Sequence, residues 1–138
     1  MAMTLTNRGM YVLGTDDASA LDLRVATFLG AVPAVATIRD WNFLSEVSTT
    51  ESSNVARQDV TGVTLTEQDG TDSVEWRGDA MVVNSVAAGE TLTHVVWYKF
   101  NASDAAAEII GVDEPAATLV TNGGNVTLPA FSVDISQA

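Results

Sequence analysis

A chain of 138 residues is long enough for one domain with a hydrophobic core and too short for two comfortable ones. Eighteen Asp and Glu against six Lys and Arg give a formal net charge of -12, which disfavours nucleic acid and anionic membrane surfaces as partners. Cysteine is absent, which excludes disulfides, a thiol nucleophile and cysteine-ligated metals.

The first regular alternation of apolar residues along the chain predicts a strand at residues 21–29. Leu21, Leu23, Val25 and Leu29 occupy alternate positions, as in a half-buried strand. Residues 1–20 before it are expected to form an N-terminal arm or a first strand. Residues 21–138 are then expected to form a single β-sandwich domain.

After Pro33 the spacing of the apolar residues changes to that of a helix. One stripe contains Val35, Ile38, Trp41, Leu44 and Val47. Thr37 could cap this helix, with Asp40 three positions later, or the helix could start earlier. We expect one short helix near residues 34–46, and no other substantial helix.

Beyond a polar loop at residues 48–54 the pattern is β throughout. Val63 and Leu65 alternate with threonines, Asp69 and Gly70 are turn residues, and residues 73–83 alternate again. This order predicts a hairpin. The residues of its second strand expected to point together away from water are Val74, Trp76, Ala80 and Val82.

Residues 94–100 hold the only histidine and the only lysine of the chain. Val96, Tyr98 and Phe100 lie on one face of this predicted strand, and Val95 and Trp97 lie on the other. A strand with two apolar faces is either central in a sandwich or covered on its outer face by another element or subunit.

The last predicted strand changes phase near Pro129 and Ala130. Its apolar residues have even numbers before this point and odd numbers after it, which a β-bulge would accommodate. The turn spacing predicts six to eight strands. The expected fold is therefore all-β, a single-domain antiparallel β-sandwich or a jelly-roll-like barrel with one short helix.

The residues give no support to a catalytic or metal site. His94 has no cysteine to activate, and no serine has the surroundings of a nucleophile elbow. Asp69 and Asp72 could offer oxygens to calcium, but they lack the EF-hand spacing, and solvated turn carboxylates are the simpler interpretation. We predict no catalytic residue, no metal site and no cofactor, and hence a protein that is not an enzyme.

Several segments carry a resemblance that covers nearly the whole chain. They are "LTNRG", "LRVATFLG", "VPAVATIRDWNFLSEV", "ARQDVTGVTLTEQDGTDSV" and "IIGVDEPAATLVTNGGNVTLPAFSVDIS". With them the chain resembles a family of small all-β structural proteins encoded by tailed bacterial and archaeal viruses. These patterns are architectural, so the resemblance assigns no catalytic residues.

The resemblance implies a capsid decoration, or cement, protein that is made in the host cytoplasm and sits on the outer surface of the virion. Its expected partners are the major capsid protein and further copies of itself, most plausibly as a homotrimer. Leu5, Tyr11 and Val12 are the candidates for a shell-facing contact, and Val95 and Trp97 for a subunit interface. The alternative is a tail-tube, connector or fibre component, including a host-surface binding module.

Overall fold

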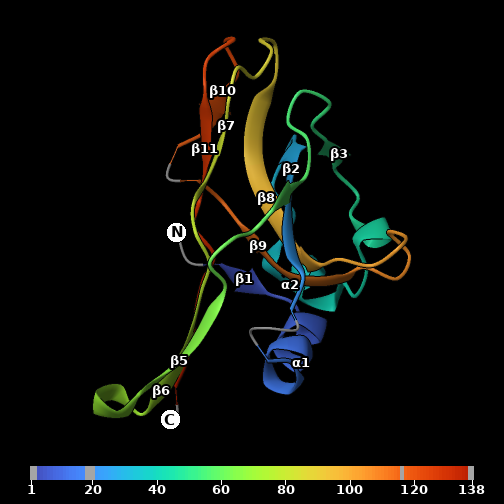
Figure 1. Ribbon diagram of the computed structural model, residues 1–138. Helices are drawn as coiled ribbons and strands as arrows, with labels where there is room; N and C mark the ends of the chain where they lie inside the picture. The colour runs from blue at the N-terminus through green and yellow to red at the C-terminus, as the bar shows by residue number, and fades with distance from the viewer. Residues whose placement is uncertain (1–2, 18–20, 116, 137–138) are drawn as a thin grey trace.

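The computed structural model describes residues 3–17, 21–115 and 117–136 of the chain (Figure 1). The protein is mainly β, with 40% strand and 16% helix, and its sheets are antiparallel, which confirms the predicted all-β class. The strands are, in chain order, β1 (Thr4–Leu5), β2 (Leu23–Leu29), β3 (Thr50–Glu51), β4 (Gln58–Asp59), β5 (Thr64–Gln68), β6 (Ser73–Arg77), β7 (Met81–Val83), β8 (Thr91–Lys99), β9 (Glu108–Asp113), β10 (Leu119–Val120), β11 (Val126–Leu128) and β12 (Ser132–Ser136).

The largest sheet is built around β8. Its strand order is β1-β9-β8-β2-β3, with β10 also pairing with β8 and β4 with β2. Val95 and Trp97 pack into one hydrophobic cluster, while Val96 and Tyr98 pack into a second cluster on the opposite face. Apart from Phe100, which follows β8 and is 42% exposed, the two apolar faces predicted for this strand are covered by the chain itself, and β8 is a central strand.

A second layer covers the face of the sheet that carries Trp97. It consists of the β7–β11 pair and the base of the three-stranded sheet β12-β6-β5, where Trp76 and Val133 join the core. Trp97 meets Phe131 edge-on, with 5.4 Å between the ring centroids, and Trp76 and Leu128 complete the contact. The arrangement is sandwich-like, with one core between the two layers.

The opposite face of the sheet is covered by a short helical segment. This segment comprises α2 (Val35–Asp40) and the 3₁₀ turn η1 (Leu44–Glu46), and it buries Ile38, Trp41 and Leu44. The helical stripe was therefore predicted correctly for these three residues. Of the two starts that the sequence left open, the earlier one is correct, because Ala34 occupies the N-cap without a side-chain hydrogen bond and Thr37 lies inside α2.

A second α-helix, α1 (Asn7–Thr15), lies where the sequence predicted an arm or a first strand. The expectation of a single helix was therefore wrong. The helix buries Gly9, Val12 and Leu13, which are spaced as one narrow face, while Met10 and Tyr11 remain exposed. Two strongly apolar residues on the outer face hide the helical period from inspection of the sequence.

The predicted phase change near Pro129 is present, but it separates two strands rather than forming a bulge within one. β11 pairs with β7 before it, and β12 pairs with β6 after it. The strands that they pair with, β6 and β7, are separated at the same level, where the Gly78 N–H donates to the carbonyl of Phe131 at 3.0 Å. The expectation that Ala80 and Val82 point inward was wrong, because both are exposed.

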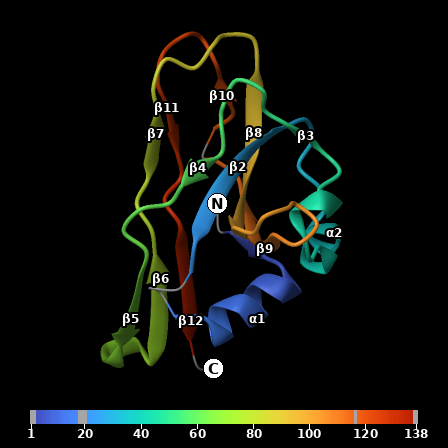
Figure 2. The ribbon, with the colours of Figure 1, turned by 45° about the vertical axis from the view of Figure 1, so that its right-hand side comes forward.

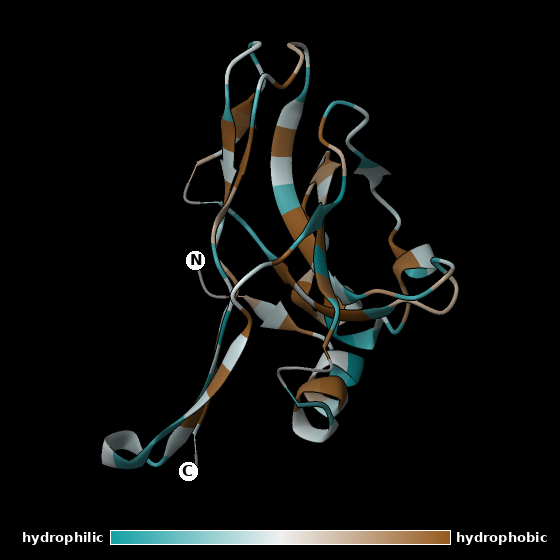
Figure 3. Ribbon diagram, in the orientation of Figure 1, coloured by the Kyte–Doolittle hydropathy of each residue, from teal (hydrophilic) through white to brown (hydrophobic). Residues whose placement is uncertain are grey.

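The predicted hairpin is confirmed and forms part of a projection that we call the arm. The arm consists of β5, β6 and β12 with the 3₁₀ turn η2 (Asp69–Thr71) at its end. Figures 1 and 2 show it extending away from the body of the sandwich, on the side opposite α2. Hydrophobic residues continue from the body into the arm (Figure 3).

Candidate interaction surfaces

The first candidate surface lies where β1, α1 and α2 meet. A shallow depression of about 550 Å³ opens there, lined by Met3, Thr4, Leu5, Asn7, Met10, Val35 and Arg39. Met10 and Val35 are exposed, and the neighbouring Tyr11 is 63% exposed. We call this region, with Tyr11 included, the N-terminal surface. It combines apolar side chains with one guanidinium group.

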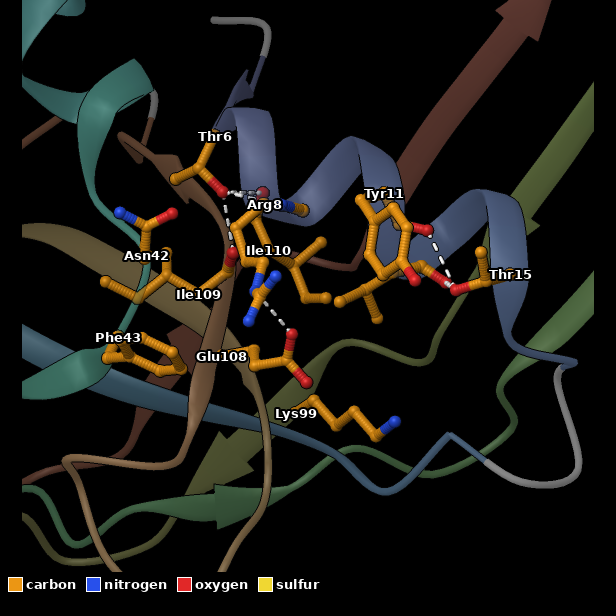
Figure 4. A network of polar contacts seen from close by, with 12 residues as sticks. Thr6, Arg8, Tyr11, Thr15, Asn42, Phe43, Lys99, Glu108, Ile109 and Ile110 are labelled. Carbon is orange, nitrogen blue, oxygen red and sulfur yellow. Dashed lines mark hydrogen bonds and ion pairs between the residues drawn. The ribbon is translucent and has the colours of Figure 1, made fainter.

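A buried polar contact fixes the start of α1 against β9. The Thr6 hydroxyl accepts the N–H of Gly9 at 2.7 Å and donates to the carbonyl of Ile109 at 2.6 Å (Figure 4). Gly9 lies so close to β9 that an added Cβ would be 1.9 Å from the Ile110 carbonyl oxygen. The backbone of α1 therefore packs directly on the edge of the sheet.

Arg8 holds the same junction from the solvent side. Its Nε lies 2.7 Å from a carboxylate oxygen of Glu108, and its guanidinium group lies over the rings of Phe43 and Tyr11 (Figure 4). These contacts orient Tyr11 along the outer side of α1. The exposed aromatic ring is thus part of an ordered surface.

Among the residues predicted to contact the shell, the structure brings Leu5 and Tyr11 to the N-terminal surface. Leu5 is half-buried in β1 and lines the depression. Val12, which was grouped with them, is only 2% exposed because it faces the core from α1. Its side chain is enclosed by the protein's own packing.

Val95 and Trp97 were expected to contact a neighbouring subunit. The structure corrects the basis of this expectation, because they are 2% and 0% exposed and pack against the second layer of the sandwich. Their apolar face is covered by β6, β7, β11 and β12 of the same chain. They belong to the fold rather than to its surface.

His94 is a buried residue of the sheet. Its Nε2 lies 3.0 Å from the Thr49 hydroxyl, its Nδ1 lies 2.8 Å from the Thr93 hydroxyl, and its ring stacks on Phe28. Burial lowers the pKa of His94 from 6.5 to about 4. The neutral ring with its two hydroxyl partners fits a structural role.

The second candidate surface is on the arm. Leu65 and Ile135 are 40% and 43% exposed, and Val74 is half-buried. A depression of about 370 Å³ at the end of the arm is lined by Glu67, Gln68, Asp69, Asp72, Ser73, Val74, Ile135 and Ser136. The alternation of residues 63–66 and 73–76 predicts a sheet with one apolar face. It does not predict that part of this face extends beyond the body of the sandwich.

The acidic residues in the described segments do not assemble a metal centre. Within the described parts of the chain, no group of three or more His, Cys, Asp or Glu side chains is placed to hold a metal ion. Asp69 and Asp72 instead border the depression on the arm. None of the helices in the described segments has the length and apolar character needed to cross a lipid bilayer.

Comparison with known proteins identifies no relative of this chain. No protein-family model matches the chain, and no curated protein and no solved structure is significantly similar to it. The interpretation of the two surfaces therefore depends on their own chemistry.

Proposed function

We propose that this chain is a virion structural protein that decorates the outer capsid and bridges neighbouring capsid subunits. One structural observation supports this function most directly. A small sandwich presents two separate regions with exposed apolar side chains, the N-terminal surface on β1, α1 and α2, and the arm. Figures 1 and 2 show that α2 and the arm lie on opposite sides. Two such regions on one body allow simultaneous attachment to two neighbours.

Bridging stabilises a shell by mass action. A protein that binds the assembled lattice, and not the separated subunits, shifts the equilibrium towards the assembled state. The N-terminal surface, with Leu5 and Tyr11, contacts one capsid subunit, while the arm reaches a second. The fully buried Trp97 contributes by holding the two layers of the sandwich together.

Self-association into a homotrimer completes the proposal. Most soluble homo-oligomers have closed symmetry, and a trimer would present three arms to the lattice. Analytical ultracentrifugation of the purified protein over a range of concentrations tests this part. If the protein is monomeric both when purified alone and when released from virions, the trimer is excluded.

The copy number in purified virions tests the location. Quantitative mass spectrometry should find this protein at a ratio to the major capsid protein near one, or at a simple fraction of it. A far smaller number, comparable with tail or fibre proteins, would instead favour the alternative of a tail-tube, connector, fibre or host-binding component. Absence from virions would refute a structural role in the particle.

The attachment surface can be tested with matched variants of exposed residues. Tyr11→Ser removes an exposed aromatic ring from the N-terminal surface, and Val120→Ser removes an exposed apolar side chain from β10. Tyr11→Ser should lower binding to particles that lack the protein, while Val120→Ser should leave binding unchanged. Equal binding by both variants would exclude Tyr11 from the contact.

A further inference from the structure

The arm has two faces of different chemistry. The pairing register places two rows of side chains on one face. The first row contains Leu65, Trp76 and Val133, and the second contains Glu67, Val74 and Ile135. Near the body Trp76 and Val133 are buried, whereas Leu65 and Ile135 are largely exposed. The apolar face therefore extends beyond the part that the body covers.

The other face of the arm is polar and satisfies its own charges. Arg77 lies 2.6 Å from Glu75 and 3.2 Å from Asp134, which are its neighbours on the same strand and on β12. This face is suited to water. The apolar face is the one that gains from being covered.

Carboxylates border the exposed end of the apolar face. Glu67, Asp69 and Asp72 line the depression whose apolar walls are Val74 and Ile135. Among the described residues, none of these three carboxylates has an ion pair. A partner that covers Val74 and Ile135 therefore places its own groups beside three uncompensated negative charges.

This charge pattern distinguishes between a second copy and a different protein. Among the described residues, Arg39 is the one cation without an ion pair, and it lies on the N-terminal surface, away from the arm. A second copy carries the same net charge of -12 and has few cations to offer. At this end of the arm like charges would oppose a second copy, whereas a basic partner would be attracted, so a trimer would form through another surface.

We propose that the apolar face of the arm docks on a different protein, at an apolar site flanked by Lys or Arg side chains. The partner's apolar groups cover Leu65, Val74 and Ile135, and its cations pair with Glu67, Asp69 and Asp72. The assignment of this partner to the virion rests on the function proposed above. Its chemistry follows from the arm alone.

Photo-cross-linking during infection tests this inference. A photoreactive amino acid is introduced at position 135 of the full chain, and at position 120 in a control, because Val120 is also exposed and lies on β10 away from the arm. Infected cells are irradiated, and the linked peptides are identified by mass spectrometry. We expect position 135 to link to a Lys- or Arg-containing segment of a different protein and position 120 not to do so.

Charge variants test the role of the carboxylates. Asp69→Asn with Asp72→Asn removes two charges from the arm, and Asp40→Asn with Glu114→Gln removes two carboxylates elsewhere that also form no ion pair within the described structure. Asp72 has a φ of 47°, a conformation that Asn tolerates well. The arm variant should reduce the link from position 135 by about tenfold, as expected for two interfacial ion pairs, while the control pair leaves it unchanged.

The outcomes separate this inference from the proposed function. Links from position 135 to another copy of this chain, links no more frequent than from position 120, or equal effects of the two charge variants would each overturn the inference. Equal melting temperatures of all variants ensure that folding does not explain a difference. A specific link to a basic protein together with absence from virions would support the arm's role and refute the virion function.

Discussion

The buried imidazole of His94 couples the stability of the sheet to pH. Its pKa of about 4 in the folded protein lies below its ordinary value of 6.5, so the unfolded chain binds a proton more readily. The stabilisation is complete above pH 6.5 and is lost as the pH falls towards 4. The ring nitrogens contact two hydroxyl groups, and no carboxylate in the described segments faces the ring. A positive charge on the imidazole would therefore be uncompensated.

Denaturant unfolding at several pH values measures this coupling. Between pH 7 and pH 4 the His94 contribution to the free energy of unfolding should fall by about 3 kcal/mol, because a tenfold change in an equilibrium corresponds to about 1.4 kcal/mol. His94→Gln should show a smaller loss over the same interval by about that amount. Parallel pH profiles of the two proteins would contradict the assignment.

Gly9 and Gly14 form a natural pair of tests within α1. A Cβ on Gly9 would collide with the backbone of β9 at Ile110, whereas a Cβ on Gly14 meets nothing within 4 Å. Gly9→Ala should therefore lower the free energy of unfolding by at least about 2 kcal/mol. Gly14→Ala should leave it unchanged or raise it by up to about 1 kcal/mol, because alanine favours the helix. Equal effects, measured by chemical denaturation, would argue against direct packing of α1 on β9.

At the scale of elements, α1 depends on the hydroxyl group of Thr6. Thr6→Val keeps the shape but removes both hydrogen bonds, so it should cost about 2–3 kcal/mol. Thr6→Ser keeps the hydroxyl and should cost about 1 kcal/mol for the lost methyl group. Hydrogen exchange should show the amides of α1 losing protection in Thr6→Val only. Similar exchange in both variants would show that the cap does not anchor the helix.

The sequence was informative where an element has one regular period. The alternation around Val25 and the turn at Asp69 predicted β2 and the hairpin correctly. The two apolar faces around Trp97 predicted either a central strand or a strand covered on its outer face, and the structure shows the central strand. The helix α1 was missed because Gly9 weakens helix propensity and the exposed Tyr11 blurs the apolar stripe. Local sequence carries no signal that Gly9 is needed for close approach to a distant strand.

The candidate surfaces were harder to predict than the strands. Tyr11 and Leu5 were identified from their apolar character and do reach the N-terminal surface, but the same character places Val12 and Trp97 in the core. Composition cannot distinguish an apolar residue that is covered by the chain from one that is not. The arm depends on where the second layer ends, which is a property of the tertiary structure.

At the scale of the whole molecule, the surplus of negative charge should make stability depend on salt. Five of the six cations already form ion pairs within the described structure, and six cations cannot neutralise eighteen acidic residues. Raising the salt from about 0.01 M to about 1 M shortens the screening length from about 30 Å to about 3 Å and weakens this repulsion. The melting temperature, followed by circular dichroism, should rise by several degrees. A decrease would show that the ion pairs outweigh the repulsion.

The position of α1 also has a consequence for the order of events during synthesis. Its docking site is β9, which ends at Asp113, and Thr6 donates to a carbonyl more than one hundred residues further along the chain. The apolar side of α1 can therefore find its partner only after most of the chain has left the ribosome. Until then Val12 and Leu13 lack β9, the strand on which the helix mainly packs, so α1 is secured late although it is made before the strands of the sandwich core.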